Sequence, residues 1–225
     1  MNVRANLETI TRNISEACER SSRESKDVKV IAVTKYVSVN RTKEALDAGV
    51  TNFGESRDEG LLEKVNALGT DPSWHFIGTL QSRKVKEIIE HVDYIHSLDR
   101  RSLAKELQKR TGREVNCFVQ VNVSGEESKH GLSPDETIPF IESLKDFPMI
   151  KVVGLMAMAP NTENREEIRD VFKTLRTLSE TVQDLSIAHA PCRELSMGMS
   201  NDYEIAVEEG ATFVRIGSSL VGNEK

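Results

Sequence analysis

A lysine at position 35 ends the first strongly apolar stretch of the chain, VIAVTK. The alternation of a strand places Lys35 on the same face as Ile31 and Val33. An amine at the end of a buried strand is partly removed from water, which favours its neutral form and its attack on a carbonyl carbon. Lys35 therefore indicates Schiff-base chemistry. The simpler interpretation is a lysine that ends a strand and reaches solvent, and this feature taken alone favours it.

Two segments near the end of the chain, LSMGMSND and RIGSSLVG, combine glycine with serine. Glycine lets the backbone approach an anion, while hydroxyls, free backbone N–H groups and a helix N-terminus favour binding of a phosphate group. The candidate residues are Ser196, Gly198, Ser200, Gly217, Ser218 and Ser219. Because glycine and serine also form ordinary turns, the phosphate interpretation depends on where the two segments lie in the fold.

The elements that must position these residues alternate along the chain. Short β-branched runs alternate with longer amphipathic stretches, which is typical of parallel strands connected by helices. We expect eight strands, at residues 29–35, 50–55, 74–78, 94–98, 116–123, 151–158, 193–198 and 213–218. This pattern predicts an α/β protein with a (β/α)8 TIM barrel, formed by residues 1–225 as a single domain with an extra N-terminal helix. An open doubly wound sheet is the alternative.

Helix boundaries carry weaker signals. Asp99 is expected to open one helix, Ser133 a second through a capping box with Glu136, and a residue at 200–201 a third. Four glycines stand where helices should end, at positions 49, 69, 112 and 210.

A TIM barrel places its chemistry on the loops that follow the strands, with phosphate sites frequently after strands seven and eight. Strand one closes against strand eight, so Lys35 should face the glycine- and serine-containing turns. The Lys35 amine and the phosphate site formed by these turns together suggest one ligand that carries both an aldehyde and a phosphate.

Arg215 stands on the last strand with Val214 and Ile216 on the opposite face. An arginine that points into the barrel needs a partner. Beside a pyridine ring nitrogen it would stay charged and donate a hydrogen bond, keeping that nitrogen unprotonated. An internal salt bridge with Glu55 or Glu194 is the alternative.

Composition narrows the range of partners. The net charge of −6, from 30 basic and 36 acidic residues mixed along the chain, predicts no nucleic-acid ligand. No apolar run has the length of a membrane span or the pattern of a signal peptide, so we expect a cytoplasmic protein. Cys18, Cys117 and Cys192 form no CxxC pair, and the histidines show no shared ligand spacing. No metal site is expected.

Six segments together resemble the pyridoxal phosphate homeostasis protein family, the proline-synthase co-transcribed homologues: VIAVTKYVS, NFGESRDE, WHFIGTLQSRKVK, VNVSGEESKHGL, GLMAMAP and LSMGMSNDYEIAVEEGATFVRIGSSLVG. The resemblance covers nearly the whole chain. It implies the alanine-racemase-type barrel (fold type III of pyridoxal phosphate proteins), with pyridoxal 5′-phosphate (PLP) held by Lys35 as an internal aldimine. It also implies that segments 196–200 and 217–219 bind the phosphate and that Arg215 lies near the pyridine nitrogen.

Asn52, His75 and Met197 match family positions that line the pocket. At two positions the sequence departs from the usual family residues, and both positions concern contacts next to the pocket. Ser56 in GESRDEG replaces the more usual asparagine and lacks its amide donor, and Arg83 in LQSRK also stands where asparagine is more usual.

The resemblance leaves the question of catalysis open. Alanine racemase needs a second base, a tyrosine from a second domain and a partner subunit. We expect no second domain here, and among Tyr36, Tyr94 and Tyr203 none is expected to serve, because alternation sends Tyr36 to the opposite face from Lys35 and Tyr203 packs inward.

We therefore expect a protein that holds PLP for intracellular vitamin B6 homeostasis and delivery without efficient turnover. A PLP-dependent amino-acid racemase and a Schiff-base aldolase are the alternatives. The expected partners are PLP and PLP-dependent apo-enzymes, for a monomer or weak homodimer. Lys129, in the polar loop 123–132, could receive PLP during transfer, although a solvated loop lysine is the simpler interpretation.

Overall fold

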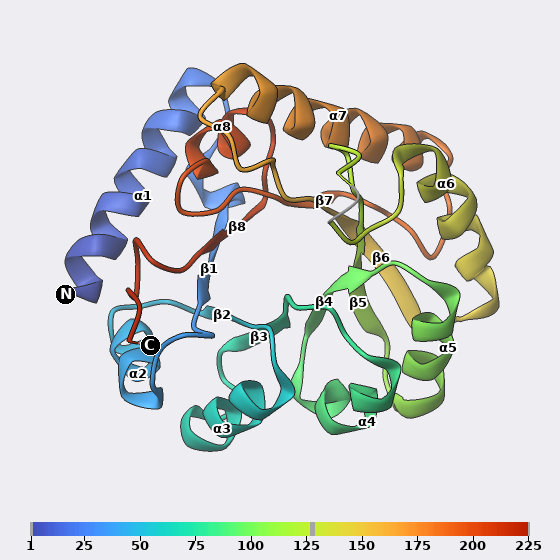
Figure 1. Ribbon diagram of the computed structural model, residues 1–225, viewed down its shortest axis with the longest axis horizontal. Helices are drawn as coiled ribbons and strands as arrows, with labels where there is room; N and C mark the ends of the chain where they lie inside the picture. Colours follow the sequence, from blue (N-terminus) through green and yellow to red (C-terminus); the bar gives the residue numbers. More distant parts are fainter. Residues whose placement is uncertain (1, 127–128, 225) are drawn as a thin grey trace.

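The computed structural model describes residues 2–126 and 129–224. Its strands are parallel and close in chain order into a barrel surrounded by helices (Figure 1). They are β1 (Lys29–Val33), β2 (Asn52–Glu55), β3 (Ser73–Phe76), β4 (Tyr94–Leu98), β5 (Val115–Gln120), β6 (Ile150–Met156), β7 (Glu194–Ser196) and β8 (Phe213–Ile216). β8 pairs with β1 and closes the sheet. The predicted (β/α)8 barrel is confirmed, and the open sheet is excluded.

The α-helices lie around the outside of this barrel (Figure 1). They are α1 (Val3–Arg20), α2 (Val39–Asp47), α3 (Asp58–Leu68), α4 (Val85–Ile88), α5 (Arg101–Arg110), α6 (Pro134–Ser143), α7 (Arg165–Asp184) and α8 (Tyr203–Glu208). The 3-10 turns are Ser25–Asp27, Ser82–Lys84, Ile89–His91 and Leu144–Asp146. The expected extra helix is α1, which lies beside α8 with Ile10 and Ile14 buried.

The capping box at Ser133 and Glu136 is confirmed. The other two expected helix starts are wrong. Asp99 pairs with the Arg100 guanidinium at 2.7 Å, and α5 begins at Arg101 without a side-chain cap. Asp202 accepts a hydrogen bond from the Met199 N–H at 2.6 Å, so residues 199–202 form a turn and α8 begins later. In both cases a local contact of an aspartate competes with helix capping.

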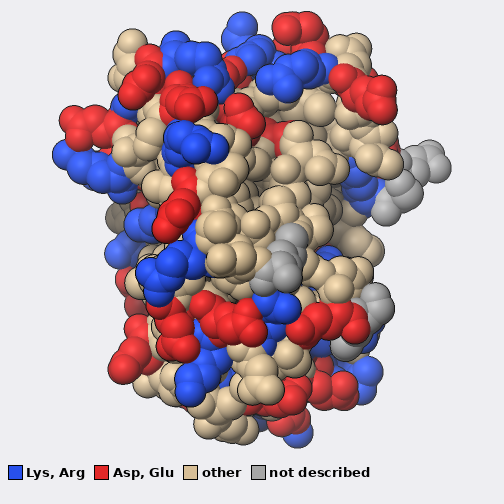
Figure 2. All heavy atoms as spheres, turned by 90° about the vertical axis from the view of Figure 1, so that its left-hand side faces the viewer, with Lys and Arg blue, Asp and Glu red and all other residues tan. Residues whose placement is uncertain are grey.

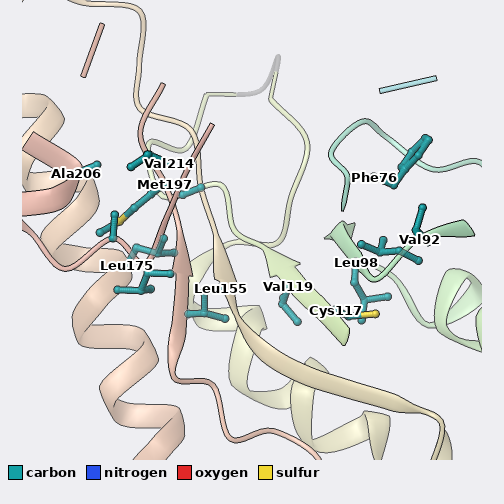
Figure 3. Packing of buried hydrophobic residues seen from close by; sticks show 14 of the residues in the cluster. Phe76, Val92, Leu98, Cys117, Val119, Leu155, Leu175, Met197, Ala206 and Val214 are labelled. Atoms are coloured by element: carbon teal, nitrogen blue, oxygen red, sulfur yellow. The ribbon is translucent and has the colours of Figure 1, made fainter. Parts of the chain in front are cut away.

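Alternation along each strand produces two cores. One lies between the barrel and its helices, where Met197, Leu175, Ala206 and Val214 pack together (Figure 3). The other fills the barrel itself with Ile31, Phe118, Met156 and Phe213. Residues on the second face of each strand therefore point at one another across the barrel, which is where polar side chains can meet.

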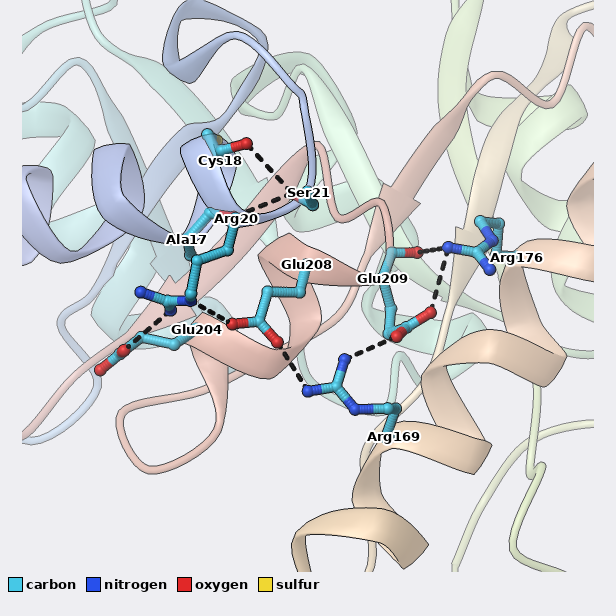
Figure 4. A network of polar contacts seen from close by, with 9 residues as sticks. All are labelled: Ala17, Cys18, Arg20, Ser21, Arg169, Arg176, Glu204, Glu208 and Glu209. Atoms are coloured by element: carbon cyan, nitrogen blue, oxygen red, sulfur yellow. Dashed lines mark hydrogen bonds and ion pairs between the residues drawn. The ribbon is translucent and has the colours of Figure 1, made fainter.

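Ion pairs connect α8 to both neighbouring helices (Figure 4). Glu208 pairs with Arg20 of α1 at 2.7 Å and with Arg169 of α7 at 2.6 Å, while Glu209 pairs with Arg169 and Arg176 at 2.7 and 3.0 Å. Single exposed pairs contribute little, but a network with shared partners holds its elements in a defined arrangement. The network thus fixes the helix that follows the glycine- and serine-containing turn after β7.

In the described part of the chain, no helix is long and apolar enough to cross a membrane. Lys and Arg side chains are intermixed with Asp and Glu on the face shown in Figure 2. This face therefore offers no continuous basic surface of the kind that nucleic-acid backbones require.

Candidate functional site

Lys35 lies in a turn directly after β1, at the rim of the barrel. Its side chain is exposed, and Nζ stands 5.0 Å from the centroid of the Tyr36 ring. The expectation that Lys35 is partly desolvated is wrong, because the chain leaves the sheet after Val33 and the strand alternation ends there. For the same reason Tyr36 lies close to the amine and not on an opposite face.

A buried polar cluster holds the backbone just before Lys35. Lys64 of α3 donates to the Thr34 carbonyl at 2.8 Å and pairs with Glu55 of β2 at 2.5 Å. The Thr34 hydroxyl donates to the same carboxylate at 2.7 Å. The Lys64 and Glu55 side chains are only 4% and 1% exposed. Sequence reasoning missed this cluster, although a lysine at helical spacing between Leu61 and Val65 was a signal for it.

The two glycine- and serine-containing turns meet at the same rim. The hydroxyl of Ser218 donates to that of Ser200 at 3.3 Å, which joins the loop after β8 to the loop after β7. Among the described residues, no acceptor is found for the backbone N–H groups of Ser200, Ser218 and Ser219. Free N–H donors beside hydroxyls are the chemistry that binds an anion. Because α8 begins only at Tyr203, this cradle is formed by turns and not by a first helical turn.

Gly198 is required by the backbone of the first turn. Its φ is +90°, and a Cβ there would lie 2.5 Å from the Ala206 Cβ. The turn therefore approaches α8 more closely than any side chain allows.

The amine and the anion cradle lie on neighbouring strands. Ala32 of β1 is in register with Ile216 of β8, and a Cβ on Gly217 would lie 3.5 Å from the Val33 Cβ. Neighbouring strands are about 4.8 Å apart. Lys35 follows Val33 by two residues and Ser218 follows Gly217 by one, so both lie on the same rim of the barrel.

Arg215 lies under this rim with its side chain buried in the barrel. Its Nη1 donates to the Ser196 hydroxyl at 2.6 Å and its Nη2 to the Ala157 carbonyl at 3.0 Å. Burial lowers the pKa of Arg215 to about 10, and the charge of Asp202 opposes that shift. No described carboxylate forms an ion pair with it. The alternative of a salt bridge with Glu55 or Glu194 is therefore wrong, and Glu55 pairs with Lys64 instead.

His75 lies inside the barrel and is fully buried. Its Nδ1 faces His96 Nε2 at 2.9 Å and its Nε2 faces Asn52 Oδ1 at 3.1 Å, while its ring stacks on Tyr94 with centroids 4.6 Å apart. Burial, with a smaller effect of Lys29, lowers the pKa of His75 to about 3, so the ring is neutral near pH 7. His96 was missed by sequence reasoning, which asked only about metal spacing.

Two predicted site residues lie apart from the rim. Met197 packs in the outer core with Ala206 and Val214 (Figure 3), because its strand neighbour Ser196 takes the inward face. Asn52 is the first residue of β2 and is in register with Ile31 of β1. Among the described contacts, it is connected to the other site residues through His75.

The structure gives Lys129 local partners. Its Nζ pairs with Glu126 at 2.6 Å and donates to the Ala159 carbonyl at 3.0 Å. Residues 127 and 128 of the same loop lie outside the described residues. In the described part of the chain, no group of three or more His, Cys, Asp or Glu could hold a metal ion.

Comparisons with known proteins identify the family of this chain. Residues 5–225 match the family described as "Alanine racemase, N-terminal domain". The pyridoxal phosphate homeostasis protein of Aquifex aeolicus is 40% identical over 232 residues, with complete coverage of both chains. That of Escherichia coli is 33% identical, covering 96% of this chain and 94% of the relative. The chain belongs to the pyridoxal phosphate homeostasis protein family.

Solved structures extend this result. PipY of Synechococcus elongatus, a structure with PLP bound, is 32% identical with a TM-score of 0.81, covering 93% of this chain and all of that chain. Alanine racemase from Corynebacterium glutamicum is 13% identical with a TM-score of 0.75, and this chain covers 60% of it. At that identity the second likeness shows the barrel fold alone. The curated relatives of the family are named as homeostasis proteins and not as enzymes.

Proposed function

We propose that this protein binds PLP covalently through Lys35 and serves cytoplasmic PLP homeostasis and delivery to apo-enzymes, without efficient turnover of its own. The observation that carries the proposal is the rim on which an exposed lysine and an anion cradle occupy adjoining strand ends. The PLP-bound structure of PipY, similar over its full length, supports the choice of ligand.

The residues at the rim fit each part of PLP. Lys35 supplies an amine that can condense with the aldehyde, forming an imine and releasing water, and its exposure leaves that reversible bond accessible. Ser200, Ser218 and Ser219, with their free N–H groups, would bind the phosphate, while Gly198 lets the first turn approach α8 and Gly217 lies against Val33 of β1. PLP supplies an aldehyde and a ring that withdraws electrons when its nitrogen is protonated.

Arg215 decides how strongly the ring could withdraw electrons. Its pKa of about 10 keeps the guanidinium charged near pH 7, so beside the pyridine nitrogen of a bound PLP it would donate a hydrogen bond and disfavour a proton there. A ring held unprotonated is a weak electron sink. This property favours holding PLP over converting amino acids.

The other predicted site residues act from beneath or beside the ligand in this proposal. Ser196 holds the Arg215 guanidinium, and His75 and Asn52 continue the hydrogen bonds below it. Met197 anchors the segment directly after β7 in the outer core.

The test is an absorbance spectrum of the purified protein before and after borohydride reduction, with a peptide map of the reduced adduct. We expect a visible band that disappears on reduction and a pyridoxyl group on Lys35. Lys35→Ala should lose the band, while Lys129→Ala, a matched rim-loop lysine with its own ion pair, should keep it. A pyridoxyl group on another residue would refute the proposal.

A racemase is the second candidate, because Tyr36 is 46% exposed and lies close to the Lys35 amine. The other two tyrosines lie inside, Tyr94 against His75 and Tyr203 against Asn13. Exchange of the α-proton of alanine in deuterated water, lost in both Lys35→Ala and Tyr36→Phe, would favour this candidate. We expect no such exchange.

A further inference from the structure

Side chains from five strands form one continuous hydrogen-bonded chain through the interior of the barrel. Arg215 Nη1 lies 2.6 Å from Ser196 Oγ, and Ser196 Oγ lies 2.8 Å from His96 Nδ1. His96 Nε2 lies 2.9 Å from His75 Nδ1, and His75 Nε2 lies 3.1 Å from Asn52 Oδ1. The chain thus runs from the cation under the rim to the start of β2.

The Arg215 guanidinium at one end and the orientation of the Asn52 amide at the other set the direction of every hydrogen bond. A guanidinium can only donate, so Ser196 Oγ accepts from Arg215. At the other end Asn52 presents Oδ1, an acceptor, while its amide nitrogen donates to the Thr51 hydroxyl at 3.1 Å. Protons must therefore point away from Arg215 along the whole chain.

Each histidine then has one allowed tautomer. The Ser196 hydroxyl donates to His96 Nδ1, so His96 carries its proton on Nε2 and donates to His75 Nδ1. His75 in turn carries its proton on Nε2 and donates to Asn52. With Asn52 Oδ1 facing His75, the opposite tautomers would leave two acceptors facing each other, in an interior where an unmade hydrogen bond is costly.

We propose that His96 is a positioning residue for Arg215 and that its contact with His75 sets the His96 tautomer. The proposal rests on the proposed function, in which Arg215 meets the pyridine ring of the ligand. By accepting the Ser196 proton, His96 turns the oxygen lone pairs of that hydroxyl toward the guanidinium. The guanidinium has five N–H donors. Among the described residues, its acceptors are the Ser196 hydroxyl and the Ala157 carbonyl. The remaining N–H donors are left for a ligand bound at the rim.

The wild-type apoprotein tests the direction of the chain without any ligand. ¹⁵N spectra of histidine-labelled protein distinguish protonated from unprotonated ring nitrogens. We expect His96 and His75 both to carry the proton on Nε2 alone. A proton on Nδ1 of either ring would overturn the proposal, whatever PLP does.

Two substitutions of His96 separate its two contacts. Asparagine places its amide oxygen near the Nδ1 position and keeps an acceptor for Ser196, whereas glutamine reaches the Nε2 position and keeps the contact to His75. The probe is pyridoxine 5′-phosphate, which has an alcohol in place of the aldehyde and cannot form an imine with Lys35. Its binding therefore remains measurable even if Lys35 does not bind PLP. A failure of the proposed function would be seen separately, in the borohydride experiment.

We expect His96→Gln to weaken binding of pyridoxine 5′-phosphate roughly tenfold, since the hydrogen bond it loses supports a charged partner. Ser196→Ala should weaken it equally, and His96→Asn should stay within about twofold of wild type. His189→Asn is the control, because its ring bonds the Ile141 carbonyl far from the barrel interior. Equal binding by the Asn and Gln variants would refute the positioning role. The ¹⁵N spectra decide the question if a variant does not fold.

Discussion

Replacement of Lys64 by methionine should destabilise the protein strongly, because it leaves the Glu55 carboxylate buried without its cation. The Lys64 ammonium lies 2.5 Å from that carboxylate, and both side chains are almost fully buried. Breaking a buried pair by removing one partner costs about 3–5 kcal/mol. The Thr34 carbonyl, which precedes Lys35, loses the Lys64 donor in the same variant and keeps the Val37 N–H at 3.1 Å.

Urea unfolding at pH 7.5 measures this cost as a change in the free energy of unfolding. We expect Lys64→Met to lose about 3–5 kcal/mol, and the double variant Lys64→Met with Glu55→Leu to recover most of it, since an apolar pair of similar volume is often neutral. Lys26→Met is the control. Its ion pair with Glu24 joins side chains 76% and 68% exposed, and such pairs contribute about 0–1 kcal/mol.

The same variant connects stability to function. Without Lys64 the turn that carries Lys35 is held at Thr34 by the Val37 N–H alone, so borohydride trapping of PLP should become slower in Lys64→Met than in Lys26→Met. A loss below about 1 kcal/mol, the range of exposed pairs, would refute the reasoning. So would a double variant no more stable than the single one.

Three further predictions follow from described contacts. The free energy of unfolding should fall as the pH drops below about 6.5: burial lowers the pKa of His75 to about 3 and holds that of His96 well below its usual range, so the unfolded chain binds protons that the folded protein does not. The loss is at most about 1.4 kcal/mol per pH unit for each histidine, and urea unfolding of His96→Asn should show a shallower slope. Gly198→Ala should cost more than about 1 kcal/mol in urea unfolding, since φ is +90° and the new Cβ meets Ala206, whereas Gly112→Ala, with nothing within 4 Å, should be neutral or slightly stabilising. Ser218→Ala should weaken binding of PLP but leave that of pyridoxal, which lacks the phosphate, unchanged in a titration.

The barrel and the place of its rim were predictable from local patterns. Strand spacing, the capping box at Ser133 and the two glycine- and serine-containing turns each depend on residues close together in the sequence. The predicted strands ran past their true ends in several places, as at Lys35, because a β-branched run does not show where a strand leaves its neighbour.

The partners of the buried polar groups could not be predicted in this way. Glu55 meets Lys64 nine residues later on a helix, and His96 meets Ser196 one hundred residues later across the barrel. Alternation alone shows that a residue faces inward. Which inward residues come within hydrogen-bond distance depends on barrel register and strand tilt.

The sequence by itself determined the order of strands and helices, the kind of fold and the residue types available at the rim. Only the tertiary structure decided that Lys35 is exposed, that Arg215 has neutral partners and that two histidines connect it to Asn52. The physical reason is that hydrophobic periodicity and capping act within a few residues. The direction of a buried hydrogen-bonded chain, in contrast, is set by groups that only the closed barrel brings together.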